Sequence, residues 1–123
     1  MIIIPTRNFN DNVEFYLRKK KYKKIYSDIK TVTDELEQGN LVGVRLEGLH
    51  LPENTAVYKV RIANSSANVG KSHGFRLIYY VAIADEIYLL TIYSKKDDIR
   101  IVTEQQIEQH IKILLEPEPQ EEE

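Results

Sequence analysis

The sequence contains no cysteine, which excludes disulfides, a thiol nucleophile and thiolate metal ligands. A chain without cysteine is typical of intracellular proteins, so we expect a cytoplasmic location. Long apolar runs are also missing. The opening segment Met1–Pro5 is too short for a signal-peptide core, and no run approaches the length that spans a membrane. We therefore expect no membrane partner.

Several signatures of catalysis are missing as well. Gly70-Lys71-Ser72 is similar to the end of a phosphate-binding loop, but Ser65 stands where that motif needs glycine, and a strand pattern follows it. The histidines at positions 50, 73 and 110 lack metal-ligand spacing, and no Gly-x-Ser-x-Gly elbow is present. His50 and His110 lie among apolar residues and are interpreted as packing residues. The sequence predicts no metal site and no cofactor.

Charge is unevenly distributed along the chain. The net charge is −2, but five of the 19 acidic residues lie in residues 116–123, which leaves 17 basic against 14 acidic residues elsewhere. With 123 residues and 42% apolar content, the chain is long enough for one domain with its own core. We predict a folded domain over residues 1–115 and an acidic, disordered tail over residues 116–123. The folded part is mildly basic, which suits a polyanionic partner.

Three successive strands are predicted between Val57 and Lys96 from Val, Ile, Tyr and Leu content and from the turn residues between them. In the first strand, alternation places Lys59 and Arg61 on the face opposite Tyr58, Val60 and Ile62. The second strand begins at Phe75, and its alternation adds Arg76 to the cationic face. The third runs from Glu86 to Ser94 and is followed by Lys95-Lys96. The cations are thus expected to lie together beside a Gly/Ser/Asn loop. This is the arrangement expected of an anion-binding site. A buried ion pair of Arg76 with Glu47 or Glu86 is the alternative.

The remaining patterns predict helices around this sheet. A β-branched run at residues 2–4 indicates an edge strand. Asn8 or Asn10 would cap a first helix, and a second helix would end near Gly39. Residues 39–56 are predicted to be a loop. Thr103 and Gln106 match a capping box that opens a C-terminal helix with Ile107 and Ile111 inward. The fold class is α+β: a twisted antiparallel sheet of about four strands, an N-terminal helical pair and a C-terminal helix.

The densest charge run lies between the first two helices. Residues 7–24 contain seven basic and two acidic side chains. Such a run is either a solvated connection or, beside a cationic sheet face, a contact with a phosphate backbone. The candidate RNA-binding residues are Lys19, Lys20, Lys21, Lys23, Lys24, Lys71 and Lys96.

Three segments together resemble a known family. Tyr58–Ile62, Gly70–Tyr80 and Ile87–Lys95, in this order and on these elements, are similar to the RelE/HigB-type toxins of bacterial type II toxin–antitoxin modules. The resemblance covers residues 1–115 and implies a RelE-like domain whose helices lie on one face of the sheet. It also implies a metal-independent, ribosome-dependent mRNA endonuclease that inhibits translation. The implied partners are a cognate antitoxin and mRNA on the ribosome.

In such enzymes the 2′-hydroxyl of the cleaved strand attacks the adjacent phosphate, which needs a base, an acid and cations. We assign Arg61 and Arg76 to the phosphate, because a planar guanidinium suits bidentate binding and stays charged. Lys95 or Lys96 stands where the family places a basic residue after the last strand. Lys59 is the candidate base, because neighbouring cations disfavour its charged form.

Two positions depart from the family pattern. His73 replaces a small residue and is either an acid or base or an exposed loop histidine. A tyrosine common in the family is missing from Ile99–Val102, where Arg100 is the only polar residue.

Two other functions stay open. A ParE-type toxin has the same fold and poisons gyrase without nuclease chemistry, and fold alone cannot separate the two. A non-catalytic RNA-binding module would bind RNA without cleaving it. In both toxin interpretations we expect an antitoxin segment to cover the sheet or the helices.

Overall fold

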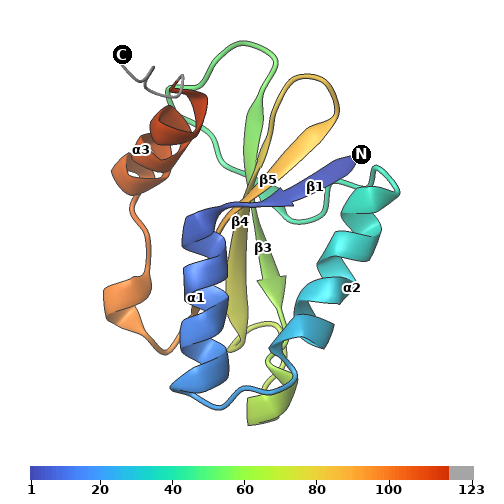
Figure 1. Ribbon diagram of the computed structural model, residues 1–123, viewed down its shortest axis with the longest axis vertical. Coiled ribbons are helices and arrows are strands. Elements are labelled where there is room, and N and C mark those ends of the chain that lie inside the picture. Colours follow the sequence, from blue (N-terminus) through green and yellow to red (C-terminus); the bar gives the residue numbers. More distant parts are fainter. Residues whose placement is uncertain (117–123) are drawn as a thin grey trace, which may run out of the picture.

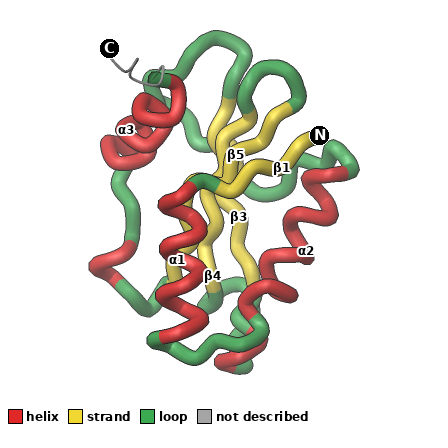
Figure 2. The backbone as a smooth tube through the Cα atoms, in the orientation of Figure 1, coloured by secondary structure: helices red, strands yellow, loops and turns green. Residues whose placement is uncertain are grey.

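The computed structural model describes residues 1–116, apart from the side chain of residue 98, and places three α-helices around a five-stranded mixed sheet (Figures 1 and 2). The elements are, in chain order, β1 (Ile2–Pro5), α1 (Arg7–Arg18), α2 (Ile25–Glu37), β2 (Val44–Arg45), β3 (Ala56–Ile62), β4 (Phe75–Val81), β5 (Glu86–Ser94) and α3 (Glu104–Leu115), with 3-10 turns η1 (Ser65–Ala67) and η2 (Asp98–Arg100). The predicted α+β class is confirmed. No helix among the described residues is long and apolar enough to cross a membrane. The predicted tail lies outside these residues from position 117 onward.

The sheet has the order β1-β5-β4-β3-β2. The predicted antiparallel arrangement of β3, β4 and β5 is confirmed. The prediction of about four antiparallel strands is corrected in two respects: β1 pairs in parallel with β5, and β2 forms inside the stretch predicted to be a loop. A two-residue strand has no alternation for a sequence to reveal, and the direction of an edge strand depends on where it docks.

The first two helices pack on one face of the sheet (Figure 1). The alternation predicted for β3 and β4 is confirmed, since Val60, Ile62, Phe75, Leu77 and Tyr79 all face these helices and are buried. Helix α1 begins at Arg7, one residue after Thr6, whose Oγ1 accepts a hydrogen bond from the Phe9 amide at 3.2 Å. Thr6, rather than Asn8 or Asn10, is therefore the N-cap. The side chain of Asn8 bonds a strand carbonyl instead, at 2.9 Å.

Helix α3 and residues 46–51 lie on the opposite face, so the expected arrangement with helices on one face is corrected. The predicted capping box at Thr103 and Gln106 is present, and Ile107 and Ile111 are buried against the sheet. His50 was expected to be half-buried, but its ring is exposed and its Nδ1 lies 3.1 Å from Glu108 Oε1. A flanking apolar residue on each side does not bury a loop histidine when an acidic partner lies at the surface.

A bulge in β5 changes which of its side chains face which layer. Ile78 of β4 pairs with Thr91, whereas the next residue pairs with Leu89, so Leu90 is an extra residue in the ladder. Helix α1 binds the bulged backbone: Asn12 Oδ1 accepts hydrogen bonds from Thr91 Oγ1 at 2.7 Å and from the Ile92 amide at 3.3 Å. After the bulge, Ile92 faces α1 and α2 while Tyr93 faces the α3 side. The bulge therefore places Tyr93 beside Arg76, its partner across the ladder.

Candidate anion-binding site

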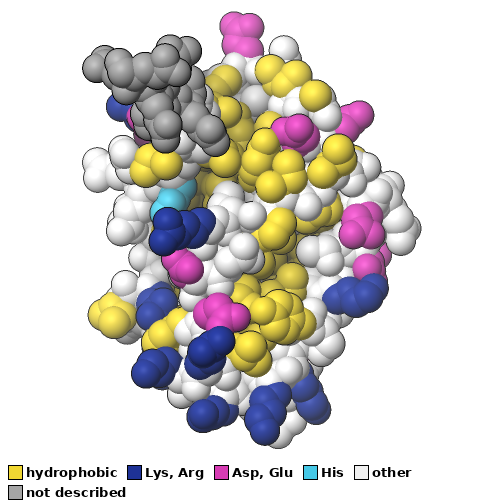
Figure 3. All heavy atoms as spheres, viewed as in Figure 1, with side chains coloured by type: hydrophobic (Ala, Val, Ile, Leu, Met, Phe, Trp, Pro, Cys, Tyr) yellow, Lys and Arg dark blue, Asp and Glu magenta, His cyan; other side chains and the backbone are white. Residues whose placement is uncertain are grey.

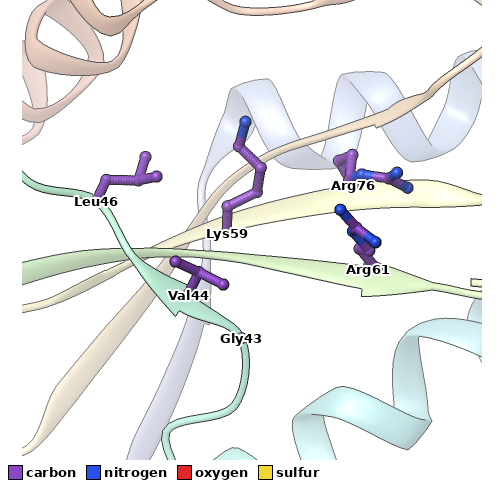
Figure 4. A pocket seen from close by; sticks show the side chains of 6 residues that line it. All are labelled: Gly43, Val44, Leu46, Lys59, Arg61 and Arg76. Carbon is purple, nitrogen blue, oxygen red and sulfur yellow. The ribbon is translucent and has the colours of Figure 1, made fainter. Parts of the chain in front are cut away.

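The face that carries α3 is divided into a covered apolar half and an open cationic half. Towards the β3–β4 loop, Lys59, Arg61 and Arg76 line one cavity of about 640 Å³ together with Gly43, Val44 and Leu46 (Figure 4). The three cations thus share a face, as the alternation predicted, and Figure 4 shows the two guanidinium groups side by side. Arg61 is exposed, Lys59 is half-buried and Arg76 is buried. We call this cavity the cationic cavity.

Electrostatics at the cationic cavity favour an anion. Arg61 and Arg76 are directly opposed in the antiparallel ladder, where like charges destabilise a sheet. Burial lowers the pKa of the Arg76 guanidinium, and the Arg61 charge lowers it further. Within residues 1–116, none of the ion pairs joins a carboxylate to Lys59, Arg61 or Arg76. A phosphate between the two guanidinium groups would relieve their repulsion and accept charge-assisted hydrogen bonds.

Arg76 is held by the loop that precedes β4. Its side chain is only 7% exposed, and it donates hydrogen bonds to the carbonyls of Lys71 at 3.1 Å, Ser72 at 3.1 Å and Phe75 at 3.2 Å. Neither pairing considered for Arg76, with Glu47 or with Glu86, occurs among the described residues. Glu86 accepts instead from the Tyr88 hydroxyl at 2.6 Å. Three bonds leave two of the five guanidinium N–H groups for a ligand.

The loop between β3 and β4 is anchored at both ends. Asp28 of α2 is buried and accepts a hydrogen bond from the Ser65 amide at 3.0 Å. Gly74 lies so close to β3 that a Cβ there would be 2.1 Å from the Ile62 carbonyl oxygen, so only glycine fits. Lys95 Nζ donates to the Ser72 carbonyl at 3.3 Å. Arg76 and Lys95 therefore both donate to the same carbonyl oxygen of the loop.

The other predicted site residues of this loop lie around the cationic cavity rather than in it. His73 is exposed, is not among the residues that line the cavity, and has its Nδ1 2.9 Å from Ser72 Oγ. Lys71 lines a neighbouring cavity of about 520 Å³, which also contains Arg61. The loop thus presents a lysine and a histidine to solvent, and neither lines the cationic cavity.

The lysine-rich connection between α1 and α2 lies at the same end of the molecule as this loop. The Lys24 amide donates to Ser66 Oγ at 2.9 Å, which joins the two connections. Lys and Arg side chains gather at this end, the lower end in Figure 3. Lys20 pairs with Asp97 at 3.6 Å, so its charge is partly compensated. The remaining predicted RNA-binding lysines of this connection and Lys96 are exposed, namely Lys19, Lys21, Lys23, Lys24 and Lys96.

Two features of this face were not predicted from the sequence. The β2 residues of the cavity wall were assigned to a loop, and nothing in their pattern indicates otherwise. Tyr93 reaches this face only through the bulge in β5, and burial raises the pKa of its hydroxyl while the Arg76 charge opposes that rise. Arg100, the only polar residue near the missing family tyrosine, lies elsewhere, with its guanidinium 3.3 Å above the centre of the Phe15 ring.

Comparison with models of known protein families finds no match, and comparison with curated proteins finds none. The resemblance to RelE/HigB toxins therefore stays a prediction, and function is argued from the site.

Proposed function

We propose that this protein is the toxin component of a toxin–antitoxin module and cleaves mRNA on the ribosome without a metal ion. The observation that supports this proposal best is the cationic cavity, where Lys59, Arg61 and Arg76 meet with no carboxylate partner among the described residues. The resemblance of the three strand segments to RelE/HigB toxins favours the same function. The proposed partners are mRNA and an antitoxin that covers the cationic face.

The chemistry proposed is attack of a ribose 2′-hydroxyl on the adjacent phosphate, which leaves a 2′,3′-cyclic phosphate and a free 5′-hydroxyl. Arg61, exposed in the cationic cavity, contacts the phosphoryl oxygens as negative charge develops. Arg76 reaches the same phosphate with its remaining donors and also fixes the loop. Lys59 is the proposed base, and Lys95 or His73, neither of which lines the cavity, is the proposed acid.

Two observations favour a second candidate, a non-catalytic RNA-binding module. Three of the five Arg76 donors are taken up by backbone carbonyls, and His73 is not among the residues lining the cationic cavity. A cavity with fewer free donors for the phosphate and no lining histidine for proton transfer suits binding better than cleavage. Such a module would bind RNA with the same cations and leave it intact.

The test is to induce the wild type, Arg61→Ala and Arg45→Ala in separate cultures and to record growth and the mapped 5′ ends of mRNA. Arg45 is an exposed arginine of β2 that pairs with Tyr58 and is not among the residues lining the cationic cavity, so it is a matched control. We expect growth arrest with cuts inside translated frames for the wild type and Arg45→Ala. Cutting by Arg61→Ala should fall about a hundredfold, as when one transition-state donor is removed.

The outcomes separate the candidates. Cut fragments that end in a 2′,3′-cyclic phosphate support the proposed chemistry. Arrest without mRNA cuts contradicts it and points to the gyrase-directed alternative. RNA binding by soluble protein without arrest or cutting supports the binding module.

A further inference from the structure

The cationic cavity has an apolar wall made by β2 and the residue that follows it. Val44 is opposite Lys59 in the ladder, so its side chain projects on the same face, and it is 69% exposed. Leu46 is half-buried against the apolar residues beneath α3 and continues this wall. Figure 4 shows both side chains beside Lys59, on the side away from Arg76. We call Val44 and Leu46 the β2 wall.

The backbone brings this wall close to the cations. At Gly43, where φ is +97°, an added Cβ would lie 2.5 Å from the Lys59 carbonyl oxygen. Only glycine allows β2 to approach β3 this closely and in this conformation. Tyr79 supports the approach from the other face by donating its hydroxyl to the Val42 carbonyl at 2.5 Å. The wall is therefore held against β3 by a buried side chain and a close backbone contact.

A cavity with cations at one end and an apolar wall at the other matches a nucleotide better than an isolated phosphate. A phosphate needs only charge and hydrogen bonds, whereas a base has flat apolar faces that gain from contact with aliphatic side chains. Lys59 and Arg61 are two residues apart on one strand, about 7 Å, so the cavity extends over more than one anionic group. Lys59 adds its aliphatic stem to the wall while its ammonium stays at the opening.

We propose that the cationic cavity binds single-stranded RNA as a nucleotide unit, with a phosphate at Arg61 and the adjacent base packed on the β2 wall. This rests on the proposed function, because it names how that site holds its substrate. The wall makes no hydrogen bonds, so it accepts any base and favours the larger face of a purine. Discrimination between RNA and DNA is left to groups that contact the 2′-hydroxyl.

The test measures binding of purified full-length protein by fluorescence anisotropy to two labelled ten-unit oligomers. One is a purine-rich RNA, and the other is a phosphodiester oligomer of tetrahydrofuran spacers, which has the backbone charges but no bases. Val44→Ser should weaken RNA binding roughly threefold to tenfold, from loss of apolar contact, and leave the spacer oligomer unchanged. Val44→Phe should tighten RNA binding alone. A DNA oligomer of the same sequence shows whether the wall acts independently of the sugar.

Ile83→Ser is the matched control, since Ile83 is 67% exposed and lies in the β4–β5 turn, outside the cationic cavity. Equal effects of Val44→Ser on both oligomers, or none on either, would overturn the proposal. An Arg61→Ala variant that binds both oligomers like the wild type would also overturn it. RNA-selective loss at Val44 in a protein that never cleaves mRNA would support the base contact while the proposed function fails.

Discussion

Arg76 occupies a buried position of β4 on the α3 side. The alternating pattern of the strand would predict an apolar residue there. Its planar guanidinium reaches three carbonyls at 3.1 to 3.2 Å, two of them in the loop outside the strand. A fork of rigid donors can serve several acceptors at once, whereas an ammonium is a compact point charge. The residue therefore shapes the loop as well as the cavity.

Replacing Arg76 with lysine should keep the positive charge but lose hydrogen bonds to the loop carbonyls. We expect the free energy of unfolding to fall by about 1 to 3 kcal/mol in urea denaturation, because one ammonium cannot serve all three carbonyls. Of the two loop carbonyls, only that of Ser72 keeps another donor among the described residues, Lys95. Amide hydrogen exchange at residues 71–74 should become faster. The control Arg45→Lys, at an exposed position, should change stability by less than about 0.5 kcal/mol. Unchanged exchange in the loop would show that Arg76 does not hold it.

At the scale of elements, helix α1 and strand β5 depend on each other through polar side chains. The N-cap residue Thr6 and the α1 residues Asn8 and Asn12 each bond backbone or side-chain atoms of residues 89–92. A bulge leaves ladder groups without strand partners, and these side chains supply them. The helix thus stabilises an irregular strand that places Tyr93 beside Arg76.

Asn12→Ala should destabilise the protein by about 1 to 3 kcal/mol, because the Ile92 amide and the Thr91 hydroxyl lose their acceptor in a largely buried site. Asn10→Ala is the comparison, since Asn10 is an exposed asparagine of the same helix. Denaturant midpoints measure the difference. If the two variants unfold alike, the Asn12 side chain contributes nothing to the bulge.

Helix α3 should make stability depend on pH through His110. Burial lowers the pKa of the half-buried His110 imidazole. The unfolded chain then binds the proton more readily than the native state, so this contribution is present above about pH 6.5 and is lost as pH falls. The advantage of the wild type over His110→Gln should shrink between pH 7 and pH 5 in urea unfolding. A constant difference over this range would contradict the assignment.

At the scale of the whole molecule, the cationic residues and the apolar core residues lie at different positions along the strands. The apolar ends of β3 and β4 lie under α3, and their cationic ends lie beside the loop end, where the lysines of the α1–α2 connection gather (Figure 3). A polyanion that enters the cationic cavity can continue across this basic end. Binding should therefore depend strongly on salt.

Removing two of these lysines should reduce the salt dependence of RNA binding. For Lys19→Ala combined with Lys23→Ala, the slope of log K against log salt should shrink by about 1.4, from about 0.7 for each contact to single-stranded RNA. Lys30→Ala with Lys112→Ala removes the same number of charges from α2 and α3, outside the α1–α2 connection, and should leave the slope unchanged, the more so because Lys30 already pairs with Asp34. Equal slopes for the two double variants would show that bound RNA does not contact the lysines of the α1–α2 connection.

The sequence by itself determined what depends on local periodicity. A period of two put Lys59, Arg61 and Arg76 on one face of adjacent strands, and the structure places them in one cavity. The capping box of α3 and the extent of β5 also follow from neighbouring residues. Such features need only the chain's own geometry, so they can be predicted before any tertiary contact is known.

Tertiary structure alone decided the parallel docking of β1, the two-residue strand β2, the bulge in β5 and the carbonyl partners of Arg76. The first three join segments that are separated in the chain, as where Asn12 meets Thr91 and Val44 meets Lys59, whereas the carbonyl partners of Arg76 are close in sequence but depend on how the loop folds back over β4. These contacts are selected by which polar groups must be satisfied and which surfaces fit once the layers pack, and no local pattern encodes that. The cations were readable from the sequence, but the wall beside them exists only because the folded chain brings β2 to the edge of β3.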